Sequence, residues 1–172
     1  MRLLSFGLLA ALLGVTGCGY HRLGAATHLP PDLHTLAVPV FANDTDAYGT
    51  ETAMTSAVIR EFNARTPYRV VPEKEADADA VLHGVILNES VTPLTYNAST
   101  QQSSSFLITM VVSATLKDRD GRVLYHNDHY VFRQQYQSTT VLPTFLQEDP
   151  AAVERLARDF ARQLVADVTE SF

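Results

Sequence analysis

The pattern of hydrophobic and polar positions predicts two helices with one apolar face each. Between residues 50 and 65, Met54, Val58 and Phe62 recur at the spacing of a single helical face. The last segment of the chain carries a second stripe, made of Val153, Leu156, Ala157, Phe160, Leu164 and Val168. It follows Asp149 and Pro150, a pair typical of the first turn of a helix. Because each helix has only one apolar side, each is expected to cover another element.

The segments between these helices read as strands. The clearest alternation of apolar and polar residues runs from Phe106 to Asp118, and Asp120-Gly121 after it is a strong hairpin signal. The returning strand, 123–136, would place Leu124 and Tyr130 on one face and Tyr125 on the other. Shorter strands are expected over 35–41, 68–72 and 80–90, and residues 95–105 read as a loop or a weakly specified strand end.

Proline 39 lies inside the first of these predicted strands. Because proline has no amide hydrogen to donate, this strand should be an edge strand, or Pro39 should sit where no ladder bond is required.

The order of strand, helix, strands, long hairpin and helix predicts an α+β fold. We expect a two-layer sandwich, with two helices packed on one face of a mixed sheet of about four strands that contains a long antiparallel hairpin. Residues 35–172 are expected to form this single domain. The other face of the sheet must be solvated or covered by a partner. It is rich in Ser, Thr, Gln, Asn and Tyr, which suits a polar or wet partner surface.

The N-terminus has the form of a secretion signal. Arg2 is followed by an apolar run and then by small residues before Cys18, the only cysteine of the chain. The sequence from Val15 to Cys18 resembles the lipobox of bacterial lipoproteins, which implies cleavage between Gly17 and Cys18 and acylation of Cys18. A free thiol or an intermolecular disulfide is the alternative for a lone cysteine.

The predicted organisation is therefore a signal peptide over residues 1–17, an acylated N-terminus and tether over 18–34, and the domain after them. Gly19 follows the cysteine where an Asp would favour inner-membrane retention in lipoproteins of the enterobacterial kind. The expected location is thus the periplasmic face of the outer membrane, with the acyl chains as the membrane anchor.

Charge and motifs point away from catalysis. The net charge of −6 becomes −7 once Arg2 is removed with the signal, which argues against nucleic acid as a partner. The acidic residues of the run 73–79 read as a solvated loop or a single helical turn rather than a calcium site. His126 and His129 would lie on opposite faces of a strand, so no metal site is expected there. No catalytic motif is present, and we expect neither an enzyme nor a cofactor.

A set of segments resembles the lipopolysaccharide-assembly lipoproteins, the LptE family. These are "CGYHRLG", "LPPDLHTLAVPVFAN", "ADAVLHGVI", "FLITMVVSATLKDRDGRVLY" and "EDPAAVERLARDFARQLVADV", in the order that this family shows. The resemblance covers essentially the whole chain after the signal. It implies a lipoprotein that is the plug and assembly partner of an LptD-type outer-membrane β-barrel. It also implies lipopolysaccharide, transported to the outer leaflet, as a further partner.

The chain departs from the family in its charges. Family members are thought to contact lipopolysaccharide through basic residues near the loops that flank the long hairpin, but here no Lys or Arg occurs between Lys74 and Lys117, or between Arg133 and Arg155. Lipid contact would rest on neutral hydrogen bonds or on the remaining arginines, or it is not a task of this protein. The candidate contact residues are Thr95, Tyr96, Asn97, Gln101, Gln102, Arg119, Arg122, Arg133, Gln134, Tyr136 and Gln147.

A second hypothesis is a periplasmic lipoprotein that binds a soluble glycan or lipid ligand without a barrel partner. It requires a concave pocket with aromatic residues on the uncovered face of the sheet. The residues that could line such a pocket are Tyr96, Tyr125, Tyr130 and Tyr136.

Overall fold

The computed structural model describes residues 29–71, 78–97, 102–137 and 150–170. Gly17 and Cys18 lie outside this range, so the signal, the cleavage site and the acylated cysteine stay predictions. Asp149, Gln101 and Gln147 also lie outside the described residues.

The described chain forms two helices and one sheet of six strands. The strands are β1 (Thr35–Ala37), β2 (Ala42–Asn43), β3 (Arg69–Val71), β4 (Ala80–Asn97), β5 (Gln102–Asp118) and β6 (Val123–Gln137). The helices are α2 (Thr50–Arg65) and α3 (Pro150–Glu170). The strand order is β3-β1-β4-β5-β6, and β2 pairs with β4 beside β1. Pairs that involve β1 and β2 are parallel, whereas β4, β5 and β6 are antiparallel.

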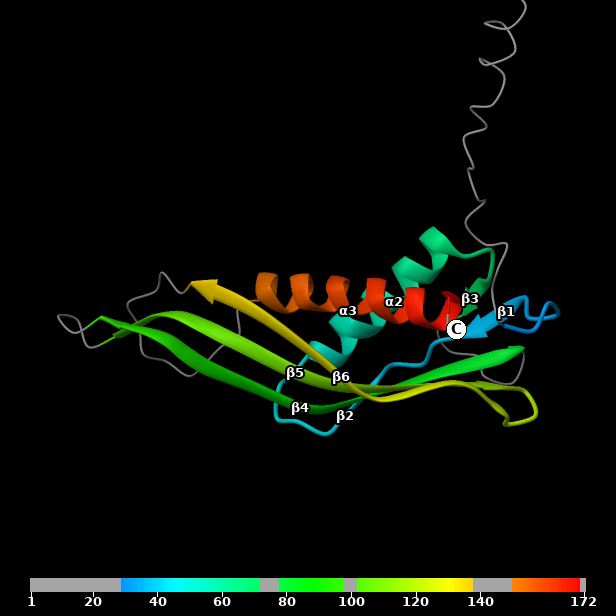
Figure 1. Ribbon diagram of the computed structural model, residues 1–172, viewed down its shortest axis with the longest axis horizontal. Helices are drawn as coiled ribbons and strands as arrows, with labels where there is room; N and C mark the ends of the chain where they lie inside the picture. Colours follow the sequence, from blue (N-terminus) through cyan, green and yellow to red (C-terminus); the bar gives the residue numbers. More distant parts are fainter. Residues whose placement is uncertain (1–28, 72–77, 98–101, 138–149, 171–172) are drawn as a thin grey trace, which may run out of the picture.

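Both helices lie on the same side of the sheet, and the long strands β4 and β5 reach beyond the start of α3 (Figure 1). The α+β class, the two helices on one face of a mixed sheet and the long hairpin are therefore confirmed. The sheet has six strands rather than about four, and two of them, β2 and β3, are only two and three residues long. The core lies between the helices and the sheet, with Phe62, Met110 and Phe160 fully buried.

The first predicted strand, 35–41, is shorter than expected, because β1 ends at Ala37, before Pro39. The chain pairs as β1 up to Ala37, leaves the ladder, and pairs again as β2 from Ala42. The residue thus sits where no ladder bond is required. The edge-strand alternative is wrong, because β1 lies between β3 and β4.

The packed part of the chain includes residues that precede Thr35. Leu29 and Leu33 are buried in the hydrophobic core, although they fall in the range 18–34 that was expected to be a tether. The amide of Leu33 donates to the carbonyl of Pro30 and closes a turn between them. The end of the predicted tether is therefore held against the domain.

Bulges shift which side chains face the helices. The register of β5 and β6 slips between the pairs Val112–Tyr130 and Ala114–Asn127, and again near Leu116. As a result Tyr125 and Tyr130 share the helix-covered face, and the predicted alternation that separated them is wrong. A strict period of two cannot anticipate an inserted residue.

Phe41 lies directly on the backbone of β4. Its ring covers Gly84 so closely that a Cβ added at this glycine would overlap with the ring. The amide of Phe41 donates to Thr55 Oγ1 in α2 at 3.0 Å, and its ring meets Phe160 of α3 edge-on, with centroids 6.1 Å apart. One buried residue therefore joins the sheet to both helices.

Replacing Gly84 with alanine should destabilise the domain. The new methyl group forces Phe41 away from Thr55 and Phe160, and overpacking of this kind costs about 1–3 kcal/mol. Urea unfolding of the chain without residues 1–18 measures this as a lower midpoint with an unchanged slope. Adding Gly84→Ala should lower the urea midpoint less in the Phe41→Leu variant than in the wild type. An unchanged midpoint for Gly84→Ala would show that the close approach is not needed.

Candidate functional site

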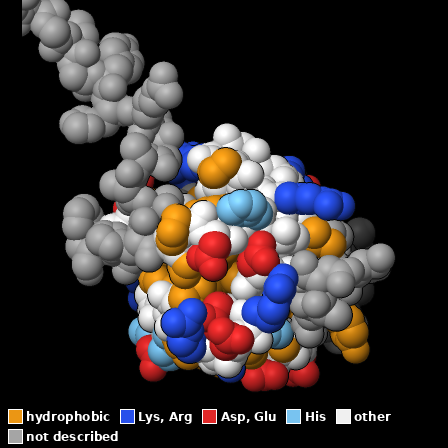
Figure 2. Space-filling model, turned by 90° about the vertical axis from the view of Figure 1, so that its right-hand side faces the viewer, with side chains coloured by type: hydrophobic (Ala, Val, Ile, Leu, Met, Phe, Trp, Pro, Cys, Tyr) orange, Lys and Arg blue, Asp and Glu red, His pale blue; other side chains and the backbone are white. Residues whose placement is uncertain are grey.

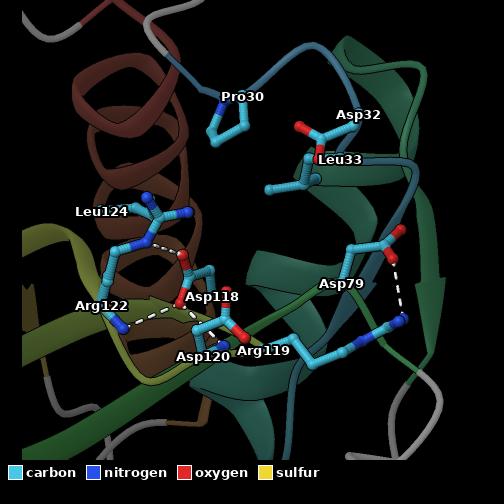
Figure 3. Close-up of a pocket in the computed structure, with 9 residues that line it drawn as sticks. All are labelled: Pro30, Asp32, Leu33, Asp79, Asp118, Arg119, Asp120, Arg122 and Leu124. Atoms are coloured by element: carbon cyan, nitrogen blue, oxygen red, sulfur yellow. Dashed lines mark hydrogen bonds and ion pairs between the residues drawn. The ribbon is translucent and has the colours of Figure 1, made fainter.

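The end of the molecule that holds the β5–β6 turn contains a pocket of about 230 Å³. Three segments far apart in the sequence form it: the residues before β1, the residue before β4, and the turn itself. The lining residues are Pro30, Asp32, Leu33, Asp79, Asp118, Arg119, Asp120, Arg122 and Leu124. Pro30, Asp32 and Leu33 line the pocket from one side, and Asp118, Asp120 and Arg122 border it on the other (Figure 3). The candidates Arg119 and Arg122 both belong to it.

Asp79 holds these segments together. Its Oδ2 accepts hydrogen bonds from the amides of His34 and Thr35 at 3.0 and 2.8 Å, and its Oδ1 accepts one from Arg119 Nη2 at 2.9 Å. The backbone hydrogen bonds from His34 and Thr35, followed by the charge of Arg119, lower the pKa of Asp79 below its usual value of 3.8. Asp79 belongs to an acidic run that was expected to be solvated, yet it is a specific structural acceptor.

Asp118 organises the hairpin turn in the same way. Its carboxylate accepts hydrogen bonds from the amide of Arg122 at 2.8 Å, from the amide of Asp120 at 3.0 Å and from Arg122 Nε at 2.6 Å. Gly121 adopts φ 83°, the left-handed conformation that the predicted Asp-Gly turn requires. Arg122 is therefore committed to closing the turn.

The charge of this pocket does not suit an anionic ligand. Four aspartates and two arginines line it, and both arginines make ion pairs, Arg119 with Asp79 and Arg122 with Asp118. Figure 2 shows this end of the molecule, where acidic and basic side chains alternate and no large field of positive charge forms. The pocket keeps an excess of two carboxylates, so it would repel a phosphate group rather than attract it.

The other candidate contact residues lie elsewhere. Thr95, Tyr96 and Asn97 are at the end of β4 and Gln102 is at the start of β5, where Asn97 pairs with Gln102. This end of the β4–β5 ladder is opposite to the end where Asp118 begins the β5–β6 turn. The candidates therefore form no single site in the described residues.

The candidates on β6 divide between the two faces of the sheet. Arg133 pairs with Thr109 on the uncovered face and is exposed. Gln134 and Tyr136 lie on the helix side, opposite Ile108 and Phe106. Tyr136 is only 6% exposed, and its ring stacks on Phe106 with centroids 5.3 Å apart. Tyr136 is thus a packing residue rather than a surface contact.

Three of the four tyrosines that could line a ligand pocket are on the wrong face for it. Tyr125 and Tyr130 hydrogen-bond through their hydroxyls, and the Tyr130 hydroxyl donates to Asp167 Oδ2 of α3 at 2.7 Å. Burial, with these two hydrogen bonds, raises the pKa of Tyr130 far above its usual range. Together with Tyr136 they lie on the helix-covered side, so they line no pocket on the uncovered face. Sequence reasoning missed the link to Asp167, because the bulge that creates it leaves no signal in the pattern.

Other chemistry is limited in the described residues. His126 shares a hydrogen bond of 2.9 Å between its Nδ1 and Thr115 Oγ1. Within the described ranges no three His, Cys, Asp or Glu side chains are grouped as a metal would require. Neither of the two described helices has the length and apolar character needed to cross a membrane.

Comparison with known proteins gives a family and a fold. Residues 33–168 match the family model described as lipopolysaccharide-assembly, LptE. None of the curated proteins matches the chain.

Among solved structures, the PelC dodecamer from Paraburkholderia phytofirmans is similar, with 13% identity and a TM-score of 0.53. The alignment covers 83% of this chain and 94% of that one. A hypothetical protein from Chlamydia trachomatis has 11% identity and a TM-score of 0.51, with 79% of this chain and 95% of that one covered. At such low identities these two structures show the fold alone.

Replacing Asp79 with asparagine should weaken the domain and change its response to acid. The lowered pKa means that the wild-type carboxylate stabilises the fold fully above about pH 4, and this contribution is lost as the pH falls through the folded-state value. The variant should lose about 1 kcal/mol at pH 7, and its stability should fall less between pH 5 and pH 2. Urea midpoints across this pH range measure both effects. Asp46→Asn, at an exposed loop position, is the control. Parallel pH profiles for wild type and Asp79→Asn would contradict the assignment.

Proposed function

The chain belongs to the lipopolysaccharide-assembly family, LptE, and on this basis we propose that it is a non-catalytic plug and assembly partner of an LptD-type outer-membrane β-barrel. The observation that carries the proposal is the family match, which spans residues 33–168 and so includes the sheet, both helices and their connections. In this role the protein supports the transport of lipopolysaccharide to the outer leaflet and performs no reaction itself.

The described surface supports a place inside a barrel. The lumen of a large barrel is polar, so a protein that occupies it should offer hydrogen-bonding side chains. The uncovered face of the sheet carries Ser90, Thr92, Thr109, Ser113 and Gln135 between its apolar positions. A two-layer domain whose helices cover only one face also leaves a flat second side for contact with a wall.

The anchor we propose is Cys18, acylated after cleavage at Gly17, on the periplasmic face of the outer membrane. Two or more acyl chains hold a protein on a membrane durably, whereas one chain binds only reversibly. The buried residues Leu29 and Leu33 leave a short segment between the anchor and the domain, which keeps the domain close to the membrane surface.

Direct contact with lipopolysaccharide, if this protein makes it, is expected away from the β5–β6 turn. Arg119 and Arg122 neutralise Asp79 and Asp118 and are surrounded by further carboxylates. Arg133 is the exposed candidate that makes no ion pair within the described residues. The alternative of a glycan-binding lipoprotein loses its main support, since Tyr125, Tyr130 and Tyr136 lie on the helix side of the sheet and not on its uncovered face.

An affinity pull-down tests the proposal. The full chain with Cys18 intact and a C-terminal tag is recovered from detergent-solubilised outer membranes and washed at high salt, and the retained proteins are identified. We expect a large β-barrel to be retained at about one copy per copy of the tagged chain. The contact with a lumen wall extends over a large surface and should therefore withstand the high-salt wash. Cys18→Ser, which removes the acylation site, controls for recovery that depends only on membrane fragments. Recovery of the lipoprotein alone under mild and stringent washes would contradict the proposal.

A further inference from the structure

The uncovered face of the sheet is not uniformly polar. We call this face, turned away from α2 and α3, the open face. An apolar band crosses its middle, formed by Ala42, Val85, Leu87, Val111 and Val131. These side chains are half-buried or exposed, and Leu87 is 42% exposed. The open face was expected to be polar, but it has an apolar centre with polar residues around it.

The strand register makes this band continuous from β2 to β6. Ala42 of β2 pairs with Val85 of β4, and Val111 of β5 pairs with Val131 of β6. The bulge in β4 inserts Leu87 between the pairs Ile86–Val112 and Asn88–Val111, which brings it next to Val111. The band thus runs across the strands instead of along one of them.

Positive charge flanks the band on both sides. Lys117 lies on the open face toward the β5–β6 turn, and Arg133 lies on it toward the other end. Both are exposed, and neither makes an ion pair within the described residues. By contrast, Arg119 and Arg122 at the turn are both paired. In the described parts of β4, β5 and β6, Asp128, at the bulge of β6, is the single carboxylate on this side. With two cations and one carboxylate, the described parts of these strands carry a net charge of 2 − 1 = +1 on the open face, whereas the chain as a whole has a net charge of −6.

We propose that the open face is the surface through which this domain docks on the wall of its barrel partner. The contacting wall should have an apolar centre matched to the band and carboxylates placed to meet Lys117 and Arg133. This inference rests on the proposed function and names the face that carries it. A second copy of the chain is a poorer occupant, because face-to-face packing would bring the same cationic flanks together.

The area of the open face is close to the area that one partner buries in a standard protein interface. Strands of about 15 residues at about 3.3 Å per residue, three abreast at about 4.8 Å, cover roughly 700 Å². A standard protein interface buries about 800 Å² on each partner, so the open face provides most of one.

Cross-linking in cells tests the orientation. A photoreactive amino acid is placed in the full-length, acylated chain at Thr109 and Val131 on the open face, and at Arg158 and Gln163 on the exposed side of α3. We expect irradiation to link the open-face positions to the barrel, and the helix positions to give at most about a tenth of that product.

Each other result has a definite meaning. Cross-links to the barrel from the helix positions alone would overturn this inference and leave the proposed function standing. Open-face cross-links only to a second copy of the chain would overturn it in favour of self-association. If the tagged chain retains no barrel even before irradiation, the proposed function fails and the inference falls with it.

A charge-reversal pair provides a second readout. Lys117→Glu/Arg133→Glu changes two exposed side chains that make no ion pair in the described structure, so the fold should be preserved. We expect recovery of the barrel to fall about fivefold, more at low salt than at high salt. Arg60→Glu/Arg158→Glu makes the same change of charge on the helices and should leave recovery unchanged. If the two double variants lower recovery of the barrel equally, the effect is a general one of charge, and the proposed docking face is contradicted.

Discussion

The architecture depends on the contact of Phe41 with Gly84. No other residue type at position 84 would let an aromatic ring rest directly on the strand. Phe41 contacts β4 and α3 through its ring and α2 through its amide, so the three elements meet at this residue. The ring of Phe160 also makes edge-to-face contacts with Tyr130 and Phe132, with ring centroids 5.5 and 5.6 Å apart. Aromatic pairs of this geometry contribute about 0.5–1.5 kcal/mol each beyond their burial. The helices are thereby held to one face of the sheet.

This one-sided arrangement leaves the protein with a surface to use. The helix-covered face takes up the large apolar side chains and three of the tyrosines. The open face keeps hydroxyl groups, an apolar band and two cations that form no ion pair with any described residue. The pocket near the β5–β6 turn has a different role. Asp79 accepts hydrogen bonds from the amides of His34 and Thr35 and from the guanidinium of Arg119, and so it fixes the segment before β1 to the hairpin turn. The chemistry of the described residues is that of a shaped contact surface, which agrees with a family of assembly lipoproteins.

Much of the fold could be predicted from the sequence, because the periodic patterns of the two helices and of β5 are strong. The bounds of α2, 50–65, follow directly from its stripe, and the Asp-Gly turn appears where it was expected. The strand predictions that are wrong share one cause: they fall at positions where the alternation of apolar and polar residues is interrupted. Pro39 lies in a segment that was predicted as one strand but pairs only up to Ala37, and the irregularities of β6 place Tyr125 and Tyr130 on one face although alternation separates them. The roles of Arg119 and Asp79 could not be predicted, since their ion pair joins residues 40 positions apart. The acylation at Cys18 rests on the sequence alone.

The role that we propose for this protein is to support the assembly of a lipopolysaccharide-transporting barrel without catalysing a reaction. Its most direct test is controlled depletion in the native organism, with folded barrel and lipopolysaccharide at the cell surface quantified over time. We expect both amounts to decline together, and re-expression of the wild-type chain to restore both. A normal amount of folded barrel and of surface lipopolysaccharide in fully depleted cells would contradict this role.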